Sequence, residues 1–176
     1  IASKLPSGSI SALVIAFQIF TFPQAVIGQA VATAAFPTFS TQAALRDVNA
    51  LRNTLANSLR GVLYFSMPAT LGLILLGHPL IAALFQNRTF TVQATGMVSW
   101  ALSWYALGLV SHSLVEVATR AFFALKDTRT PVAIGIIAMM VNVGLSVVLS
   151  ALFARLDWAP HGGLALANTV ATTMEM

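Results

Sequence analysis

Residues 8–40 read GSISALVIAFQIFTFPQAVIGQAVATAAFPTFS, and this stretch decides how the chain folds. It contains no Asp, Glu, Lys, Arg or His, and apolar residues dominate it. A helix rises about 1.5 Å per residue and the hydrocarbon core of a bilayer is about 30 Å thick, so about 20 residues suffice to cross it. Because the stretch is longer than that, we predict a membrane-spanning helix that tilts, bends or projects beyond the bilayer.

Polar residues and a proline interrupt this span. Gln18, Gln24 and Gln29 lie among apolar residues, and Pro23 falls near the middle. Amides in hydrocarbon cost free energy unless they face protein or a water-filled cavity. Thr21 shares a helix face with Gln18, so we predict that Gln18, Thr21 and Gln24 line a substrate cavity. The alternative is hydrogen bonding between helices, worth about 0.6–2 kcal/mol in a bundle, and the residues alone favour neither.

The composition of the whole chain agrees with a membrane protein. Of 176 residues, 57% are hydrophobic and 8% are charged, whereas about a quarter are charged in soluble domains. We therefore predict an all-α, polytopic transmembrane helical bundle. Cysteine is absent, which excludes disulfides and thiolate metal sites within this sequence. The net charge of +4 comes from residues in short loops, so it indicates topology and no nucleic-acid partner.

The apolar runs divide a single membrane domain fragment, residues 1–176, into five spans. We predict them at about 9–40, 61–77, 92–125, 132–154 and 164–176. Residues 41–60 form an amphipathic pattern that predicts an interfacial helix feeding the second span, with a solvated linker helix as the alternative. The sequence lacks an initiator Met and stops inside an apolar run, so we expect it to be part of a longer protein.

Basic residues are distributed unevenly between the two sides of this predicted bundle. One side carries three, and the other carries six. Cytoplasmic loops are enriched in Lys and Arg, so we predict that residues 41–60 and 126–131 are cytoplasmic. The aromatic residues Trp100, Trp104, Tyr105 and Trp158 then fall on the outer side, near the level of an aromatic belt. The richer side consists of Arg46, Arg52, Arg60, Arg120, Lys126 and Arg129.

Charged residues near the cytoplasmic end form a second group of candidates. Glu116 and Arg120 are four residues apart within an apolar span, and this spacing predicts an ion pair. A role in gating is the functional alternative to simple neutralisation. Lys126, Asp127 and Arg129 follow in a tight turn, and we group them with this pair as cytoplasmic gate or turn residues.

Prolines and small residues predict bending and close packing. Pro23, Pro37 and Pro68 are candidate hinges, although static kinks explain such prolines equally well. Gly28 begins a Gly-x-x-x-Ala seam of the kind that lets helices approach closely. Asn142, midway along the fourth span, is interpreted as a polar contact within the bundle.

Motifs for chemistry are absent from the sequence. His78, His112 and His161 are far apart and have no metal-ligand spacing. Phosphate-binding loops, zinc-protease motifs and nucleophile elbows do not occur either. We therefore predict a protein that is not an enzyme, with no catalytic residues, no metal and no cofactor.

Three segments carry a resemblance to a known family. They are Phe22–Pro23 with Gly28 and AFPTFS at 35–40, RAFFALKDTRTPV at 120–132, and GLALANT at 163–169. Together they resemble the MurJ/MviN lipid II flippases, which belong to the multidrug/oligosaccharidyl-lipid/polysaccharide exporter superfamily. The resemblance covers essentially the whole chain.

The resemblance implies that the chain corresponds to the end of the seventh span through the start of the twelfth, out of fourteen. It would form most of the second lobe of an exporter that flips lipid II, an undecaprenyl-pyrophosphate-linked peptidoglycan precursor, across the bacterial inner membrane by alternating access. The implied partners are membrane lipids, this lipid-linked saccharide and the N-terminal lobe of the same protein.

One departure from the family pattern affects the expected substrate. The family often has an arginine and a glutamate where this chain has Gln18 and Thr21, and arginine suits a pyrophosphate in charge and geometry. Two alternatives to a lipid II flippase therefore stay open. One is an exporter of drugs or other lipid-linked polysaccharides in the same superfamily, and the other is a non-transporting membrane scaffold protein.

Overall fold

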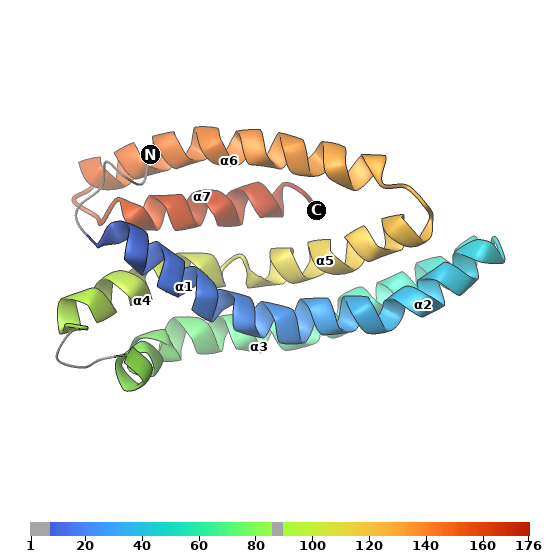
Figure 1. Ribbon diagram of the computed structural model, residues 1–176, viewed down its shortest axis with the longest axis horizontal. Coiled ribbons are helices and arrows are strands. Elements are labelled where there is room, and N and C mark those ends of the chain that lie inside the picture. Colours follow the sequence, from blue (N-terminus) through green and yellow to red (C-terminus); the bar gives the residue numbers. More distant parts are fainter. Residues whose placement is uncertain (1–7, 86–89) are drawn as a thin grey trace.

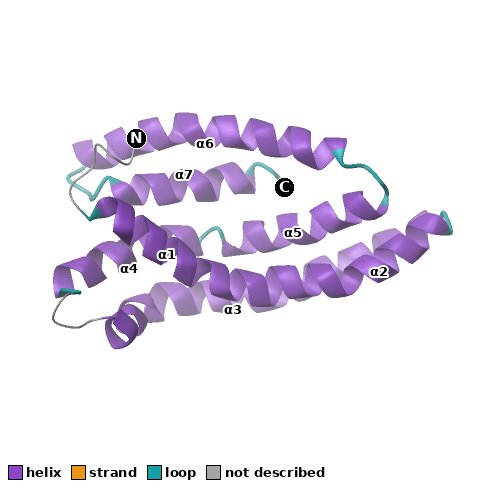
Figure 2. Cartoon of the chain, viewed as in Figure 1, coloured by secondary structure: helices purple, strands orange, loops and turns teal. Residues whose placement is uncertain are grey.

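The computed structural model describes residues 8–85 and 90–176, and these residues form helices and short connections without any strand (Figures 1 and 2). The all-α prediction is confirmed for this part of the chain. The elements in order are α1 (Ser9–Gln24), the π-helix η2 (Ala25–Gln29), α2 (Ala30–Ala44), α3 (Val48–Phe85), α4 (Val92–Ala106), α5 (Leu109–Ala124), α6 (Arg129–Arg155) and α7 (His161–Thr173).

The first three elements join into one continuous helix of 36 residues, Ser9–Ala44. Pro23 lies just before η2. Proline has no N–H to donate and its ring crowds the preceding turn, and a single π-helical turn is one way in which a helix absorbs such a defect. The helix therefore changes its hydrogen-bonding pattern near the middle of the long apolar stretch.

Gly28 sets the contact between this helix and α5. It is buried, and a Cβ atom added to it would lie 2.9 Å from the Cα of Ser113. Ala32, one turn later, is also fully buried. The small-residue seam predicted from the sequence therefore packs against a neighbouring helix.

A single 38-residue helix, α3, occupies the region where the sequence predicted an interfacial helix followed by a separate span. It begins at Val48, and the Asp47 carboxylate caps it by accepting a hydrogen bond from the N–H of Ala50 at 2.9 Å. Residues 41–44 belong instead to α2. The helix also continues through Pro68, so the amphipathic and apolar segments form one unbroken element.

The predicted third span, 92–125, is divided into α4 and α5 by a break at Leu107–Gly108. A Cβ atom at Gly108 would lie 2.9 Å from Oγ1 of Thr169. The Thr169 hydroxyl in turn donates to the carbonyl oxygen of Trp104 at 2.8 Å. The break is therefore stabilised by α7, and hydropathy within residues 92–125 contained no sign of it.

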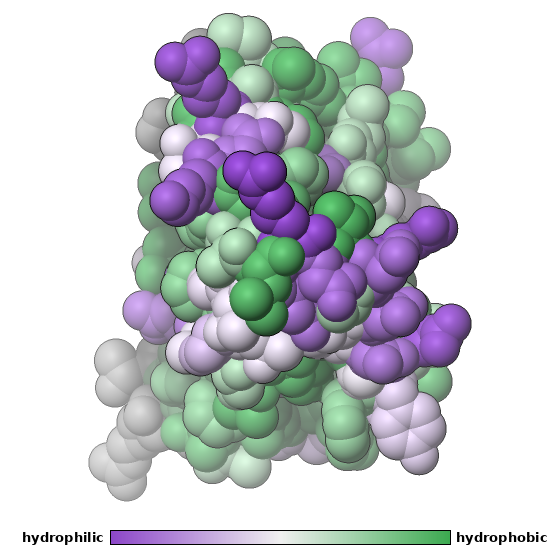
Figure 3. All heavy atoms as spheres, turned by 90° about the vertical axis from the view of Figure 1, so that its right-hand side faces the viewer, coloured by the Kyte–Doolittle hydropathy of each residue, from purple (hydrophilic) through white to green (hydrophobic). Residues whose placement is uncertain are grey.

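The two ends of the bundle differ in polarity. The α2–α3 and α5–α6 connections both lie toward the right-hand end of Figure 1. Arg46, Arg52, Lys126 and Arg129 are exposed there, and Figure 3, which looks onto this end, shows hydrophilic residues gathered among apolar ones. The structure thus puts two basic turns that are 80 residues apart in sequence at the same end of the bundle.

Aromatic side chains mark the opposite end. Trp100 contacts Trp104 and Trp158, with ring centroids 5.5 and 5.8 Å apart, and Phe153 lies 5.3 Å from both Trp104 and Trp158. Among the three tryptophans, only Trp158 is exposed. They form a packed cluster joining α4, α6 and the connection between α6 and α7, rather than a row of separate rings facing lipid.

The surface of the long helices is apolar. Leu71 and Leu75 on α3 are 60% and 73% exposed, and Met139 and Met140 on α6 are each 71% exposed. Among the described residues, Ser9–Ala44, Val48–Phe85 and Arg129–Arg155 are long and apolar enough to cross a membrane, by length and composition. Such exposed surfaces are stable in lipid and unstable in water, as expected of a membrane protein.

Candidate functional site

A polar cavity of about 330 Å³ lies inside the bundle. Four helical elements contribute to it: α1, α5, α6 and the α7 region. Amides, carboxylates, a hydroxyl and an imidazole make its lining more polar than the surfaces around it. The lining residues are Gln24, His112, Val115, Glu116, Gly135, Ala138, Met139, Asn142, Asn168, Ala171, Thr172 and Glu175.

Helical spacing explains how these polar groups come to face one another. His112 and Glu116 are four residues apart on α5 and therefore share a face. Asn168, Thr172 and Glu175 follow the same rule on and just after α7. Two helices thus each present a polar stripe to the same space.

His112 joins the two stripes. Its Nε2 atom lies 3.1 Å from Oδ1 of Asn168 and 3.2 Å from Oγ1 of Thr172. Its ring also packs against Phe20 of α1 in a T-shaped arrangement, with a centroid separation of 5.2 Å. The sequence analysis assigned no function to His112 or Thr172, because their proximity depends on how α5 and α7 pack.

The predicted ion pair between Glu116 and Arg120 is confirmed. Arg120 Nη2 donates to Glu116 Oε1 at 3.2 Å, and both side chains are partly exposed. Glu116 also lines the polar cavity, so the pair connects the cavity with the cytoplasmic end predicted from charge.

Asn142 lines the cavity from α6, but its hydrogen bond is local. Its Oδ1 accepts from the Ser146 hydroxyl at 3.1 Å, one turn along the same helix. Among the described residues, Asn142 therefore makes its hydrogen bond within α6 and not to another helix of the bundle. Its position beside a cavity could not be inferred from the sequence of its own span.

The three residues predicted to line a substrate cavity separate into two groups. Gln24 lines the polar cavity, whereas Gln18 is exposed on the outside of α1. The Thr21 hydroxyl donates to the carbonyl oxygen of Gln18 at 2.8 Å. Within residues 8–85 and 90–176, the amides of Gln18 and Gln24 make no hydrogen bond to another helix, so the described arrangement does not support the interhelical alternative.

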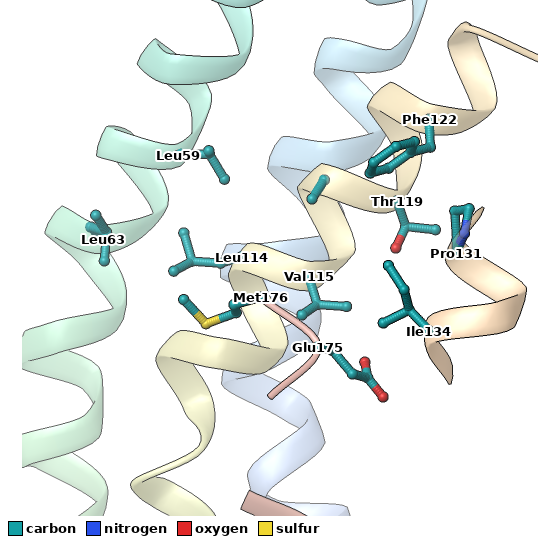
Figure 4. A pocket seen from close by; sticks show the side chains of 11 residues that line it. Leu59, Leu63, Leu114, Val115, Thr119, Phe122, Pro131, Ile134, Glu175 and Met176 are labelled. Atoms are coloured by element: carbon teal, nitrogen blue, oxygen red, sulfur yellow. The ribbon is translucent and has the colours of Figure 1, made fainter. Parts of the chain in front are cut away.

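A second cavity, of about 340 Å³, is mainly apolar (Figure 4). Leu59 and Leu63 of α3 line one side, and Leu114 of α5 lies between them and Ile134 of α6. Glu175 borders both cavities. An apolar lining of this kind suits hydrocarbon chains or apolar side chains.

The residues grouped as gate or turn residues form a capped turn before α6. Asp127 Oδ1 accepts from the N–H groups of Arg129 and Thr130, each at 3.1 Å, and Oδ2 accepts from the Thr130 hydroxyl at 2.6 Å. These bonds, led by the one from the hydroxyl, hold the pKa of Asp127 below its usual value because they favour the charged carboxylate. Lys126 adopts a left-handed conformation with φ 61°.

The candidate hinges at Pro37 and Pro68 lie within unbroken helices. Pro37 is exposed in α2, and its carbonyl oxygen accepts from the Thr41 hydroxyl at 3.0 Å. Pro68 is exposed in α3. Only Pro23 coincides with a change in helix type, so it is the strongest of the three hinge candidates, although hinge motion itself stays a prediction.

Long apolar helices with exposed hydrophobic surfaces, a polar cavity between them and a basic end define a helical membrane protein with a polar interior. Among the described residues no group of three His, Cys, Asp or Glu side chains is placed to hold a metal ion.

Comparisons with known proteins narrow this class. The family described as "Lipid II flippase MurJ" matches residues 1–176. A "Probable lipid II flippase MurJ" from Vibrio cholerae is 34% identical over 176 residues, which are 100% of this chain and 32% of that protein. A protein of the same description from Rickettsia prowazekii is 31% identical over 169 residues, covering 96% of this chain and 32% of the relative.

A solved structure, "Lipid II flippase MurJ, inward closed conformation", resembles the fold with a TM-score of 0.82 and 28% identity. The match covers 95% of this chain and 34% of that structure. The chain therefore belongs to the MurJ lipid II flippase family, and it spans about one third of the length of the relatives it matches.

Proposed function

We propose that this chain forms part of a transporter that flips lipid II across the bacterial inner membrane by alternating access. The observation that carries the proposal is the family match over residues 1–176, supported by the fold it shares with a MurJ structure. The proposed activity requires no chemical step on the substrate. Its proposed partners are membrane lipids, undecaprenyl-pyrophosphate-linked lipid II and the remaining lobe of the same protein.

The proposed orientation puts residues 41–60 and the turn at 126–131 on the cytoplasmic side. The gathering of Arg46, Lys126 and Arg129 at one end of the bundle supports it, because cytoplasmic ends are enriched in basic residues. The tryptophan cluster would then lie toward the outer surface.

The outer face of α1, which includes Gln18, is the proposed border of the translocation pathway. An exposed amide in the middle of an apolar helix is stable in a membrane only beside water, substrate or another polar surface. Gln18 and the half-buried Thr21 carry no charge, so cations for a pyrophosphate would come from the other lobe.

The test is substrate-protected labelling in the full-length transporter, from which native cysteines are removed. Gln18→Cys should react with a membrane-impermeant thiol reagent, and lipid II should slow this reaction. Val147→Cys on α6 is the matched control, since Val147 is 53% exposed on an apolar helix face and should stay shielded by lipid. Equal protection of both cysteines would contradict the proposal and favour a scaffold.

A second candidate, export of a different lipid-linked saccharide, is favoured by one observation. The positions of Gln18 and Thr21 lack the arginine and glutamate that the family pattern often has. Flipping of lipid II and of another undecaprenyl-linked glycan by the same proteoliposomes distinguishes the two. Transport of the second glycan alone would overturn the lipid II assignment.

A further inference from the structure

The polar cavity contains a histidine, His112, whose second ring nitrogen has no hydrogen-bond partner among the described residues. Both hydrogen bonds of His112 involve Nε2. Because Oδ1 of Asn168 can only accept a hydrogen bond, Nε2 carries the hydrogen in this arrangement and Nδ1 is the basic atom. Among the described residues, Nδ1 is not one of the fully buried unpaired atoms, so it retains access to open space.

The space beside His112 is large enough for water. A water molecule occupies about 30 Å³ in the liquid, and the cavity has about 330 Å³ with several amide and carboxylate groups to bind it. A proton acceptor, space for water and a polar lining therefore meet at one place in the bundle.

The charged groups around His112 continue toward the basic end of the bundle. Glu116 lies one turn further along α5, and Arg120, its ion-pair partner, lies one turn beyond that. From the α7 side, Glu175 also lines the cavity, while the lining contributed by α1 and α6 carries no charged side chain. Chains of acidic residues and histidines inside membrane helices are typical of proton pathways.

We propose that His112 is a proton-binding site of the transporter, reached from the basic end through the water-filled cavity beside Glu116. In the binding step, a hydronium ion gives its proton to the Nδ1 lone pair and leaves as water. The Nε2–H bonds to α7 persist, and the new positive charge attracts the Glu116 carboxylate away from Arg120. The proton thereby links the α5–α7 contact to the ion pair near the cytoplasmic end.

The site is independent of what the transporter carries. If lipid II flipping failed in the assays above, proton binding at His112 would be unaffected, and the reverse also holds. The test therefore measures the protonation state of the His112 ring directly.

The experiment is ¹⁵N nuclear magnetic resonance of histidine-labelled full-length protein in lipid bilayers between pH 5 and 8.5. One resonance, identified by its loss in His112→Gln, should change from the neutral to the protonated form in this range. The reason to expect protonation in this range is geometric, because the Glu116 carboxylate borders the same cavity and favours the imidazolium ion. A resonance that stays neutral down to pH 5 would overturn the proposal.

Two neighbouring substitutions test the linkage with opposite signs. Glu116→Gln removes the carboxylate that stabilises the imidazolium ion and should lower the midpoint by about one pH unit, which is tenfold weaker proton binding. Arg120→Gln releases that carboxylate and should raise the midpoint. These variants identify the resonance even if His112→Gln does not fold, and unchanged midpoints in both would refute the link to the ion pair.

Two other histidines supply matched controls. His161 is buried and its Nε2 bonds the carbonyl oxygen of Met97 at 3.0 Å, at the opposite end of α7. His78 is exposed on α3. His161→Gln and His78→Gln should each leave the titration of the His112 resonance unchanged. A shift of that midpoint in both controls would mean that the titration reports the whole fold, and this would overturn the local assignment.

Discussion

Replacing Gly28 by alanine tests the close contact between the π-helix and α5. The added Cβ would lie 2.9 Å from Cα, 3.1 Å from Cβ and 3.2 Å from Oγ of Ser113. The nearest of these atoms is backbone, so a side-chain rotation cannot relieve the clash, and the two helices must separate. Overpacking of this kind costs about 1–3 kcal/mol, while the better helix propensity of alanine returns up to about 1 kcal/mol. We expect a net loss of about 1–2 kcal/mol.

The measurement is the thermal or denaturant stability of the full-length protein in a mild detergent. Gly144→Ala is the matched control, because Gly144 lies within α6 and nothing surrounds its added Cβ within 4 Å. This control should be neutral or slightly stabilising, since alanine favours the helix more than glycine does. A Gly28→Ala protein as stable as the Gly144→Ala protein would refute the argument that η2 and α5 are in backbone contact.

Three further perturbations address other parts of the molecule. Thr169→Val should lower the free energy of unfolding by about 1 kcal/mol in the same stability assay, because it removes the hydrogen bond to the carbonyl oxygen of Trp104 at the α4–α5 break. Thr33→Val, at an exposed position in α2, is the control and should have little effect on stability. Asp127 has a lowered pKa, so its stabilising contribution is present above the unfolded-state pKa of about 3.9 and is lost as pH falls through the folded value. In a series of melting temperatures measured at different pH values, Asp127→Asn should reduce the loss of stability at acid pH. An unchanged pH profile would contradict the stabilising role of the Asp127 hydrogen bonds before α6. Glu116→Gln should change the free energy of unfolding by no more than about 0.5 kcal/mol, since partly exposed i, i+4 ion pairs contribute little. If this variant is stable but transports much less, the Glu116 carboxylate has a role in transport. A large loss of stability would contradict the expected small effect.

The sequence predicted the elements that depend on local pattern. The apolar stretch around Phe20 and the charge-free run in 132–154 both form long helices, and the Glu116–Arg120 pair forms as its spacing indicated. These features require only helical periodicity and composition, which a single sequence contains in full.

The features that the sequence analysis missed depend on contacts between distant segments. The break at Gly108 exists because Thr169, 61 residues later, approaches its backbone. The polar cavity needs α7 to bring Asn168 and Thr172 opposite His112. The sequence analysis paired Glu116 with Arg120 but did not connect His112 with them, because the role of His112 depends on the facing helix α7.

The π-helix and the cavity share one turn of α5, and this arrangement connects their behaviour. Ser113 is the residue that Gly28 touches, and its neighbour His112 bonds the α7 side of the cavity. Gln24, which lines the same cavity, directly precedes η2. A change of η2 from π-helix to α-helix would rotate Gln24 relative to Gly28, because the two forms differ in residues per turn. Since packed interfaces adopt discrete arrangements rather than deforming continuously, such a change would have to move α5 or expel Gln24 from the cavity. The defect at Pro23 therefore lies where a small change in backbone hydrogen bonding alters the polar interior of the bundle.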